Sequence, residues 1–229
     1  MNIVIPFDGE GEEELRFALR SIDMNFQHDN VYLVSVKVPD WIKNVIIVPQ
    51  EDIHKHNKDA NLFDKVFAAI DFGLQGDFMF WSDDQICLKK HDPIVVYNRR
   101  NPFFIRPQSK WQVRLVETAF LIKKMTGVQI DRNFDSHVPQ PMNTDRFNRL
   151  RNIDYQSGNG LCICTLYYGL NYPNKMVEQE SVKQTYELSR ETKVEDANKI
   201  WLGFDVGSFH RIVKPFLYKK FTKKSKFEK

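Results

Sequence analysis

The chain has 229 residues, of which 42% are hydrophobic and 28% are charged, and its net charge is +3. This composition is typical of an ordinary globular protein, and a chain of this length forms one large α/β domain or two small ones. No apolar run approaches the roughly 18 residues that span a bilayer, which excludes a transmembrane helix. Residues 1–5 lack the basic region of a signal peptide, so we expect a cytoplasmic protein.

The first third of the chain alternates between strands and helices. Short apolar runs predict strands at residues 2–5, 31–36, 45–48 and 78–81. Apolar residues at helical spacing predict helices at residues 12–25 and 59–74. Parallel strands that are linked through a helix form right-handed units. We therefore predict an α/β, Rossmann-like fold with a mainly parallel central sheet and helices on both faces.

The rest of the chain is less regular. We expect strands at residues 92–97 and 200–204, helices at 110–127, 146–152 and 209–221, and loops at 98–107 and 131–144. The apolar run 161–168 fits either a strand or a helix, and the charged stretch 175–199 is predicted as a surface excursion. Without a repeat or a linker, residues 1–218 are expected to form a single domain, followed by a basic tail at 219–229.

The three cysteines, Cys87, Cys162 and Cys164, do not have the spacing of a metal site. We expect all three to be reduced and mostly buried. Cys162 and Cys164 alternate in the sequence, which places them on one face if their segment is a strand.

Two adjacent carboxylates, Asp83 and Asp84, follow the most apolar predicted strand. The carboxyl ends of strands in open α/β sheets are where ligands bind. Two like charges side by side are costly unless a cation or a set of donors neutralises them, and Mg²⁺ or Mn²⁺ is the simplest neutraliser. The alternative is that the pair only opens a turn, as Asp often does.

The order of these elements resembles a nucleotide-sugar transferase of the GT-A type. Three stretches resemble, more closely, the second conserved block of the Stealth family of sugar-phosphate transferases. They are Glu-Leu-Arg-Phe-Ala-Leu-Arg-Ser-Ile at residues 14–22, Pro39-Asp40-Trp41, and Phe-Trp-Ser-Asp-Asp at residues 80–84. His137-Val138-Pro139 is similar to a later block of that family. The opening block of Stealth proteins is absent, and Ser82 stands where asparagine is usual.

The chain also resembles, in size and in its basic end, phage-encoded glycosyltransferases that decorate hydroxymethylated DNA bases. This resemblance implies a duplex DNA acceptor and, for a phage-encoded protein, a location in the host cytoplasm. The main functional hypothesis is therefore a metal-dependent glycosyltransferase that uses a nucleotide-sugar donor. The alternatives are a Stealth-like sugar-phosphate transferase of polysaccharide synthesis, and a non-catalytic protein that binds a sugar-nucleotide or nucleic acid.

The predicted donor site takes residues from several elements. Asp83 and Asp84, with His137 as a third ligand, are predicted to hold Mn²⁺ or Mg²⁺, which would bridge the donor diphosphate. Arg16 and Arg20 stand one helical turn apart and are expected to bind the phosphates, with Lys65. Asn61, one turn before Lys65, is predicted to contact the ribose or the sugar, and Asp8 the nucleoside. The candidates for the acceptor base are Asp205, Asp135 and His137.

Basic residues are spread over the second half of the chain. Those predicted to bind the phosphates of nucleic acid are Arg99, Arg100, Arg146, Arg149, Lys219, Lys220, Lys223 and Lys224. A track for DNA requires that they share one face with the sugar site. The competing interpretation is a polysaccharide or lipid-linked acceptor, with the basic tail resting on an anionic membrane.

Overall fold

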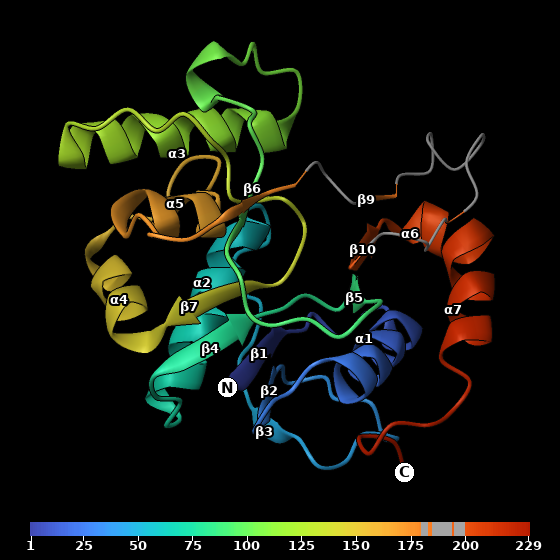
Figure 1. Cartoon of the computed structure of the whole chain (residues 1–229). Coiled ribbons are helices and arrows are strands. Elements are labelled where there is room, and N and C mark those ends of the chain that lie inside the picture. The colour runs from blue at the N-terminus through green and yellow to red at the C-terminus, as the bar shows by residue number, and fades with distance from the viewer. Residues whose placement is uncertain (180–182, 185–193, 195–199) are drawn as a thin grey trace.

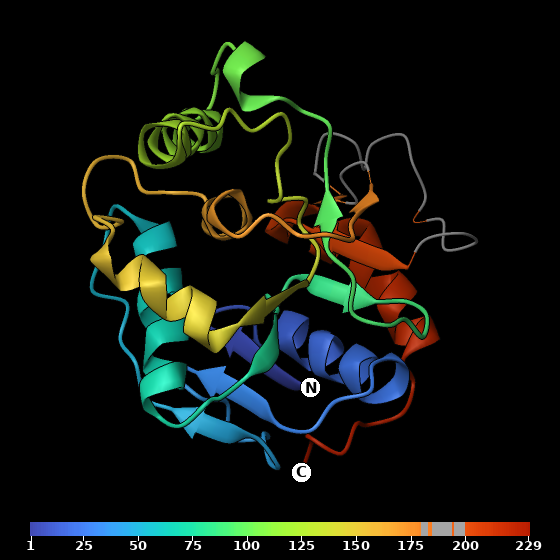
Figure 2. The same cartoon turned by 60° about the vertical axis from the view of Figure 1, so that its left-hand side comes forward.

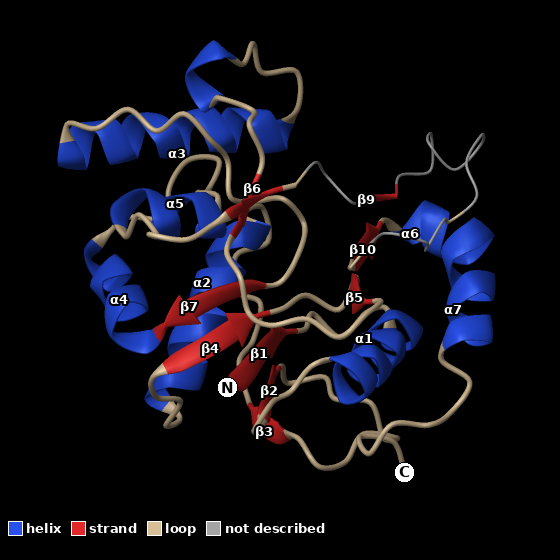
Figure 3. Cartoon of the chain, in the orientation of Figure 1, coloured by secondary structure: helices blue, strands red, loops and turns tan. Residues whose placement is uncertain are grey.

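The fold, seen in a computed structural model, is built on a five-stranded sheet with the order β3-β2-β1-β4-β7. The structure describes residues 1–179, 183–184, 194 and 200–229. The strands are β1 (Asn2–Pro6), β2 (Val31–Val34), β3 (Ile46–Val48), β4 (Asp77–Phe80) and β7 (Gln140–Asn143). The first four strands in this order are parallel, and β7 runs antiparallel to β4 (Figures 1 and 3). The predicted, mainly parallel sheet is thus confirmed.

Helices cover both faces of this sheet because its strands are apolar on both sides. Ile3 and Ile5 of β1 pack toward α1 (Glu12–Asn25), where they meet Leu15 and its neighbours. Val4, between them, points to the other face and joins the cluster under α2 (Lys58–Asp71). Such alternation is the direct result of the strand's twofold side-chain period.

A second layer of helices lies beyond α2. It contains α3 (Lys110–Thr126), α4 (Thr144–Asn148) and α5 (Ile163–Leu170), with short 3₁₀ helices at Pro102–Phe104 and Arg149–Asn152. The helix α5 packs against both α2 and α3, so α3 is the outermost of the three (Figure 2). Ser109 caps the start of α3 through the backbone N–H of Gln112, and Gly127 ends it in the left-handed conformation.

Smaller strands and helices make up the rest of the structure. The strands β5 (Gln85–Cys87), β10 (Trp201–Phe204) and β9 (Lys183–Gln184) form one small sheet, and β6 (Val96–Tyr97) pairs with β8 (Val177–Glu178). The chain then forms α6 (Val206–Ser208), a π-helical turn at Phe209–Val213, and α7 (Lys214–Lys220). Phe17 of α1 packs with Phe204 and Phe209, which fixes this unit against the outer side of α1.

Several local predictions need correction. The run 161–168 is helical, since α5 begins at Ile163, so Cys162 and Cys164 do not share a strand face. The prediction for residues 92–97 was too long, because only Val96 and Tyr97 pair. The strands β5 and β7 were missed. Most of the stretch 175–199 lies outside the described residues. All three cysteines are free and buried, as predicted.

Residues 221–229 dock on the domain. The rings of Phe221 and Phe227 are buried. The carboxylate of Glu228 accepts two hydrogen bonds from the guanidinium of Arg20, both of 2.7 Å. Lys219, Lys223 and Lys224 remain exposed to solvent. In the described part of the chain, no helix has the length and apolarity that a membrane span requires.

Candidate functional site

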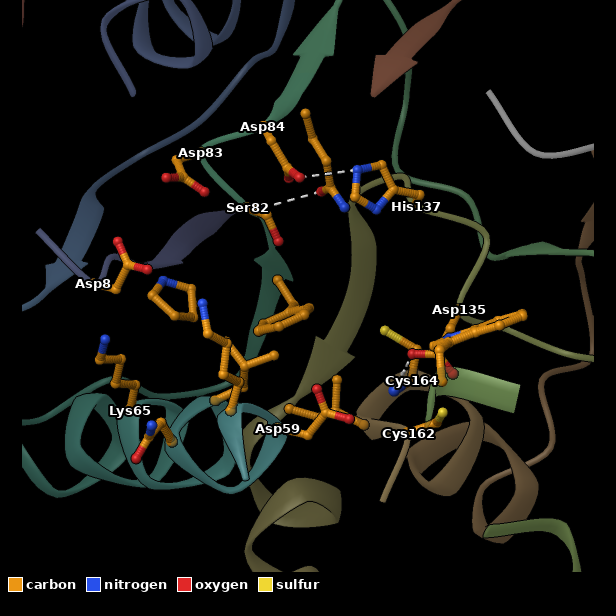
Figure 4. Close-up of a pocket in the computed structure, with 18 of the residues that line it drawn as sticks. Asp8, Asp59, Lys65, Ser82, Asp83, Asp84, Asp135, His137, Cys162 and Cys164 are labelled. Carbon is orange, nitrogen blue, oxygen red and sulfur yellow. Dashed lines mark hydrogen bonds and ion pairs between the residues drawn. The ribbon is translucent and has the colours of Figure 1, made fainter. Parts of the chain in front are cut away.

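A cavity of about 710 Å³ opens at the carboxyl edge of the sheet. Residues that follow β1 and β4 form one end of it, and residues from the starts of α2, α3 and α5 form the other (Figure 4). The cavity lies at the adjacent carboxyl ends of β1 and β4, which are paired in parallel. This is the edge at which open α/β sheets bind ligands. We call the two parts the strand end and the helix end.

The strand end is acidic. Asp8 follows β1, and Asp83 and Asp84 follow β4 in a turn between Ser82 and Gln85. The Ser82 N–H donates to the side-chain oxygen of Gln85 at 3.1 Å, and the indole of Trp81 donates to the Gln85 carbonyl at 2.8 Å. The two carboxylates therefore stand in a turn directly after the strand. The turn holds the two carboxylates at the cavity wall.

These carboxylates lie in each other's electric field. Burial raises the pKa of Asp83 well above its ordinary value, and the charges of Asp84 and Asp8 raise it further. Glu14, in the first turn of α1, has a raised pKa for the same reasons, burial first and then Asp84. Gly11 lies against both Glu14 and Asp83, and its positive φ of 69° suits glycine. The strand end thus concentrates negative charge that water only partly solvates.

His137 reaches the strand end from the loop before β7. Its Nε2 lies 3.0 Å from Oδ2 of Asp84 as an ion-pair contact. The approach lacks hydrogen-bond geometry, and this buried nitrogen forms no hydrogen bond with any described residue. The ring packs against Gly203 of β10, where a side chain would collide with it. His137 also has a positive φ of 57°, so its backbone is held in a conformation that few residues adopt.

The strand end suits a divalent cation that is shared with a phosphate ligand. Within the described ranges, no three His, Cys, Asp or Glu side chains form a group that could hold a metal by themselves. Mg²⁺ in proteins is usually held by one or two carboxylates and the phosphates of the substrate, not by an all-protein cage. Asp83 and Asp84 supply such oxygens, and burial with the neighbouring negative charges raises the pKa of Asp83, so a cation is favoured beside it. The residues therefore fit the predicted Mn²⁺ or Mg²⁺.

Lys65 and Asn61, one turn apart on α2, both line the cavity. The ammonium of Lys65, only 2% exposed as a residue, donates to the carbonyl of Phe7 at 2.7 Å and to Asp52 at 2.8 Å. The side chain of Asn61 exchanges hydrogen bonds with the backbone of His54. Both side chains therefore anchor the loops that frame the cavity, and Lys65 holds the backbone next to Asp8.

The helix end carries a partnered pair of charges. Nε of Arg114, on α3, lies 2.5 Å from Oδ2 of Asp59 as an ion pair, although the two groups are not aligned as a hydrogen bond. Burial raises the pKa of Asp59 to about 6, while Arg114 opposes this shift. Trp111 lines the same end, one turn before Arg114.

Asp135 lies at the same end and is used by the fold. It accepts hydrogen bonds from the backbone N–H groups of Cys164 and Thr165 and from the Thr165 hydroxyl, at 3.3, 3.0 and 2.5 Å. These contacts cap the first turn of α5. Burial still raises its pKa, because the desolvation outweighs the hydrogen bonds. The predicted base thus already serves as a helix cap.

Three predicted residues are not among those that line the cavity. Arg20 binds Glu228 and the Phe221 carbonyl, and the guanidinium of Arg16 stacks 4.5 Å above the ring of Trp41. Both lie on the side of α1 that faces the C-terminal segment. Asp205 caps α6 by accepting from the Ser208 N–H at 2.8 Å. The spacing of Arg16 and Arg20 correctly predicted a shared helix face, but not what that face meets.

The basic residues assigned to nucleic acid are not gathered on one face. Arg146 lies on α4 and Arg149 just after it, whereas Lys219 and Lys220 lie on α7, on the opposite side of the molecule in both views (Figures 1 and 2). Arg99 forms an ion pair with Glu178, at 2.5 Å. Arg100, next to it, and Lys223 and Lys224, after α7, are exposed. The structure therefore does not bring together the predicted phosphate track.

Sequence reasoning missed the Asp59–Arg114 pair. Asp59 stands in the first turn of a helix, where acidic residues are common, and Arg114 reads as an ordinary surface charge of another helix. The two residues are 55 positions apart. Only the packing of α3 and α2 on α5 brings them together, and no local signal in the sequence records that arrangement.

Comparison with known proteins reveals the fold. The inositol-1-phosphate CTP transferase from T. maritima superimposes with a TM-score of 0.52 at 10% sequence identity, over 97% of this chain and 96% of that one. A glycosyltransferase involved in glycosylation of the major capsid of PBCV-1 aligns with a TM-score of 0.42, 8% identity and coverage of 88% and 91%. The glycosyltransferase GlyE of Streptococcus pneumoniae TIGR4 aligns at 0.45 and 10%, over 96% of this chain and 60% of GlyE.

The first of these comparisons shows that the chain has a GT-A-like α/β fold, shared with the CTP transferase. At these identities the likeness concerns the fold alone. No protein-family model matches the sequence, and a search of curated proteins found no match. The resemblance to the Stealth family remains a prediction from the motifs.

Proposed function

We propose that this chain is a metal-dependent glycosyltransferase that moves a sugar from a nucleotide-sugar donor to an acceptor hydroxyl. The observation that carries the proposal is the acidic strand end of a cavity of about 710 Å³, at the carboxyl edge of a GT-A-like sheet. Cavities of about 300–1,000 Å³ are typical of sites for ligands and cofactors. Buried carboxylates with raised pKa values are typical of functional sites.

In this proposal the strand end binds the donor. Asp83 and Asp84 hold Mn²⁺ or Mg²⁺, which supplies charge neutralisation for the departing diphosphate. Asp8 accepts hydrogen bonds from the ribose or the base. Lys55 and Lys58 line the cavity at the start of α2, which belongs to the helix end, and the positive end of the helix dipole there favours a phosphate that extends from the strand end. Lys65 keeps the loop that carries Asp8 in place.

The helix end would bind the acceptor, with Asp59 as the base. A pKa of about 6 leaves Asp59 mostly ionised at neutral pH and still able to take a proton. The acceptor oxygen forms a bond to the anomeric carbon as the bond from that carbon to the diphosphate breaks. The diphosphate leaves with the electron pair, and Asp59 takes the hydroxyl proton. Asp135 is committed to α5 and Asp205 caps α6, so Asp59 is the stronger candidate among these carboxylates.

The direct test is thermal shift with nucleoside diphosphates, with and without Mn²⁺, followed by hydrolysis assays with a panel of nucleotide-sugars. We expect a nucleoside diphosphate with Mn²⁺ to raise the melting temperature. At a ligand concentration of a hundred times its Kd, binding should add about 2.7 kcal/mol to the free energy of unfolding. Asp84→Asn should remove the Mn²⁺-dependent part. Asp92→Asn, an exposed aspartate outside the cavity lining, is the matched control and should behave like wild type. No shift with any diphosphate would remove the proposal.

Product analysis separates the other transferase reactions. The basic residues Lys55 and Lys58 at the cavity would also suit a substrate with a second phosphate group. Sugar-phosphate transfer of the Stealth kind would release a nucleoside monophosphate, and nucleotidyl transfer from a triphosphate would release pyrophosphate. A nucleoside diphosphate as product supports the main proposal. Ligand binding without any turnover would instead indicate the non-catalytic alternative.

The acceptor can be tested in the same assay. A hydroxymethylated base in duplex DNA, which a transferase would have to flip out of the stack, remains a prediction. The scattered placement of the basic residues does not favour it. The assay measures incorporation of labelled sugar into three acceptors: DNA that contains hydroxymethylcytosine, unmodified DNA, and soluble sugars. The acceptor that becomes labelled identifies the acceptor class.

A further inference from the structure

An aromatic cluster stands exposed on the outer layer of the molecule. Phe104, in the 3₁₀ helix before α3, is 83% exposed, and Phe120, on α3, is 56% exposed. Phe103, which precedes Phe104 in the 3₁₀ helix, links the two, since its ring packs edge-on against Phe120 with the centroids 5.1 Å apart. In two views this segment lies on the far side of α3 from the central sheet (Figures 1 and 2). Single exposed apolar residues are normal, but contiguous ones mark interaction surfaces.

The same region is strongly basic. Residues 98–128 contain seven Lys and Arg and a single acidic residue, Glu117, a net charge of +6. The whole chain carries +3, so all the other residues together carry −3. Arg99 and Arg114 have ion-pair partners, but the side chains of Arg100, Arg106, Lys110, Lys123 and Lys124 are exposed. The ammonium of Lys123 lies 5.5 Å from the centre of the Phe103 ring, so charge and aromatic surface are contiguous.

We infer that the aromatic cluster and its basic surround form a docking surface for an anionic lipid membrane. Peripheral membrane sites combine Phe or Trp, which enter the boundary between headgroups and acyl chains, with Lys and Arg that attract anionic lipids. Phe104 at the tip of its segment has the exposure that insertion requires. No described helix could cross the membrane, so the contact would be peripheral.

Two other occupants fit the surface less well. A second copy of this chain would bring two surfaces of high positive charge together, and like charges oppose such a contact. The phosphates of a nucleic acid duplex would match the basic residues but would leave the exposed Phe104 in water. A lipid surface satisfies both the charge and the apolar area. The inference does not depend on the proposed reaction.

The test is cosedimentation of the full chain with vesicles of phosphatidylcholine, with and without phosphatidylglycerol. We expect binding only to the anionic vesicles, and weaker binding as salt is raised. Phe104→Ser combined with Phe120→Ser should weaken it about tenfold or more, because each ring loses its apolar burial. Phe72→Ser is the matched control, since Phe72 is also 56% exposed but ends α2 elsewhere on the surface. It should bind like wild type.

A second pair of variants tests the charge. Arg100→Gln with Lys124→Gln should weaken binding to anionic vesicles about thirtyfold, at about fivefold for each basic residue. Lys219→Gln with Lys223→Gln removes the same charge from the C-terminal region and should have little effect. The inference is overturned if anionic vesicles are not bound, or if the control variants weaken binding as much as the test variants. It is also overturned if light scattering shows a dimer that Phe104→Ser dissociates. The same holds if the cluster variants lose binding to duplex DNA but still bind anionic vesicles like wild type.

Discussion

The two ends of the cavity solve the problem of buried charge in different ways. At the helix end, Asp59 faces Arg114, and Asp135 receives the N–H groups of α5. At the strand end, burial raises the pKa of Asp83, and the charges of Asp84, Asp8 and Glu14 raise it further. The difference teaches that the carboxylates of the helix end have partners within the chain, although burial still raises their pKa values. The strand end is built mainly from carboxylates that disfavour one another's ionised form, with His137 beside Asp84, and such carboxylates favour binding of a cation.

The largest expected effect is on stability, at the helix end. Arg114→Met leaves the mostly buried side chain of Asp59, 17% exposed, without its cation, which should reduce the free energy of unfolding by about 3 kcal/mol. Urea unfolding at neutral pH measures it. Adding Asp59→Asn to that variant should restore part of the loss, because the unpaired charge is then gone. If Arg114→Met is as stable as wild type, Arg114 does not compensate the charge of Asp59.

The pH dependence of stability sharpens the comparison. Burial raises the pKa of Asp59 in the folded state from 3.8 to about 6. Its contribution to stability is therefore fully present below pH 3.8 and is lost as the pH rises to about 6, a change of up to about 3 kcal/mol. Asp59→Asn should flatten the pH profile of the unfolding free energy in that window. An unchanged profile would show that the folded-state pKa of Asp59 is not raised.

At the strand end a substitution should stabilise. Asp83→Asn removes one of the mutually repelling carboxylates and should raise the metal-free unfolding free energy at pH 7 by about 1 kcal/mol. The same variant should lose the stabilisation by Mn²⁺ with a nucleoside diphosphate. A decrease in metal-free stability would mean that Asp83 makes a favourable contact within the chain. The carboxylates of both ends would then have partners in the protein.

The smallest effect concerns charges far from either end. Lys219→Gln with Lys223→Gln should change the free energy of unfolding by less than about 0.5 kcal/mol and leave transfer activity unchanged. Thermal unfolding and the donor assay measure both. A large loss of activity would bring the C-terminal lysines back as substrate contacts.

Much of the fold was predictable, because periodicity is local. The helix at residues 12–25 and the strand that leads to Asp83 follow directly from their apolar patterns. The strand β7 was not predictable, since Gln140 and Pro141 do not resemble a strand, and pairing with β4 supplies the stabilisation. For the site, the spacing of Asn61 and Lys65 correctly predicted one shared face. The partners of Arg20 and Asp59 lie far away in the sequence, so packing alone decides them.

The contact between Arg20 and Glu228 spans 208 positions of the chain. Closing a loop of that length carries an entropy cost that must be met before the contact forms, and contacts of high sequence separation slow folding. The outer side of α1 is therefore covered by the last residues of the chain, through a contact that only the nearly complete chain can form. The strand end of the cavity consists of residues that follow β1 and β4, so its carboxylates do not depend on that distant contact.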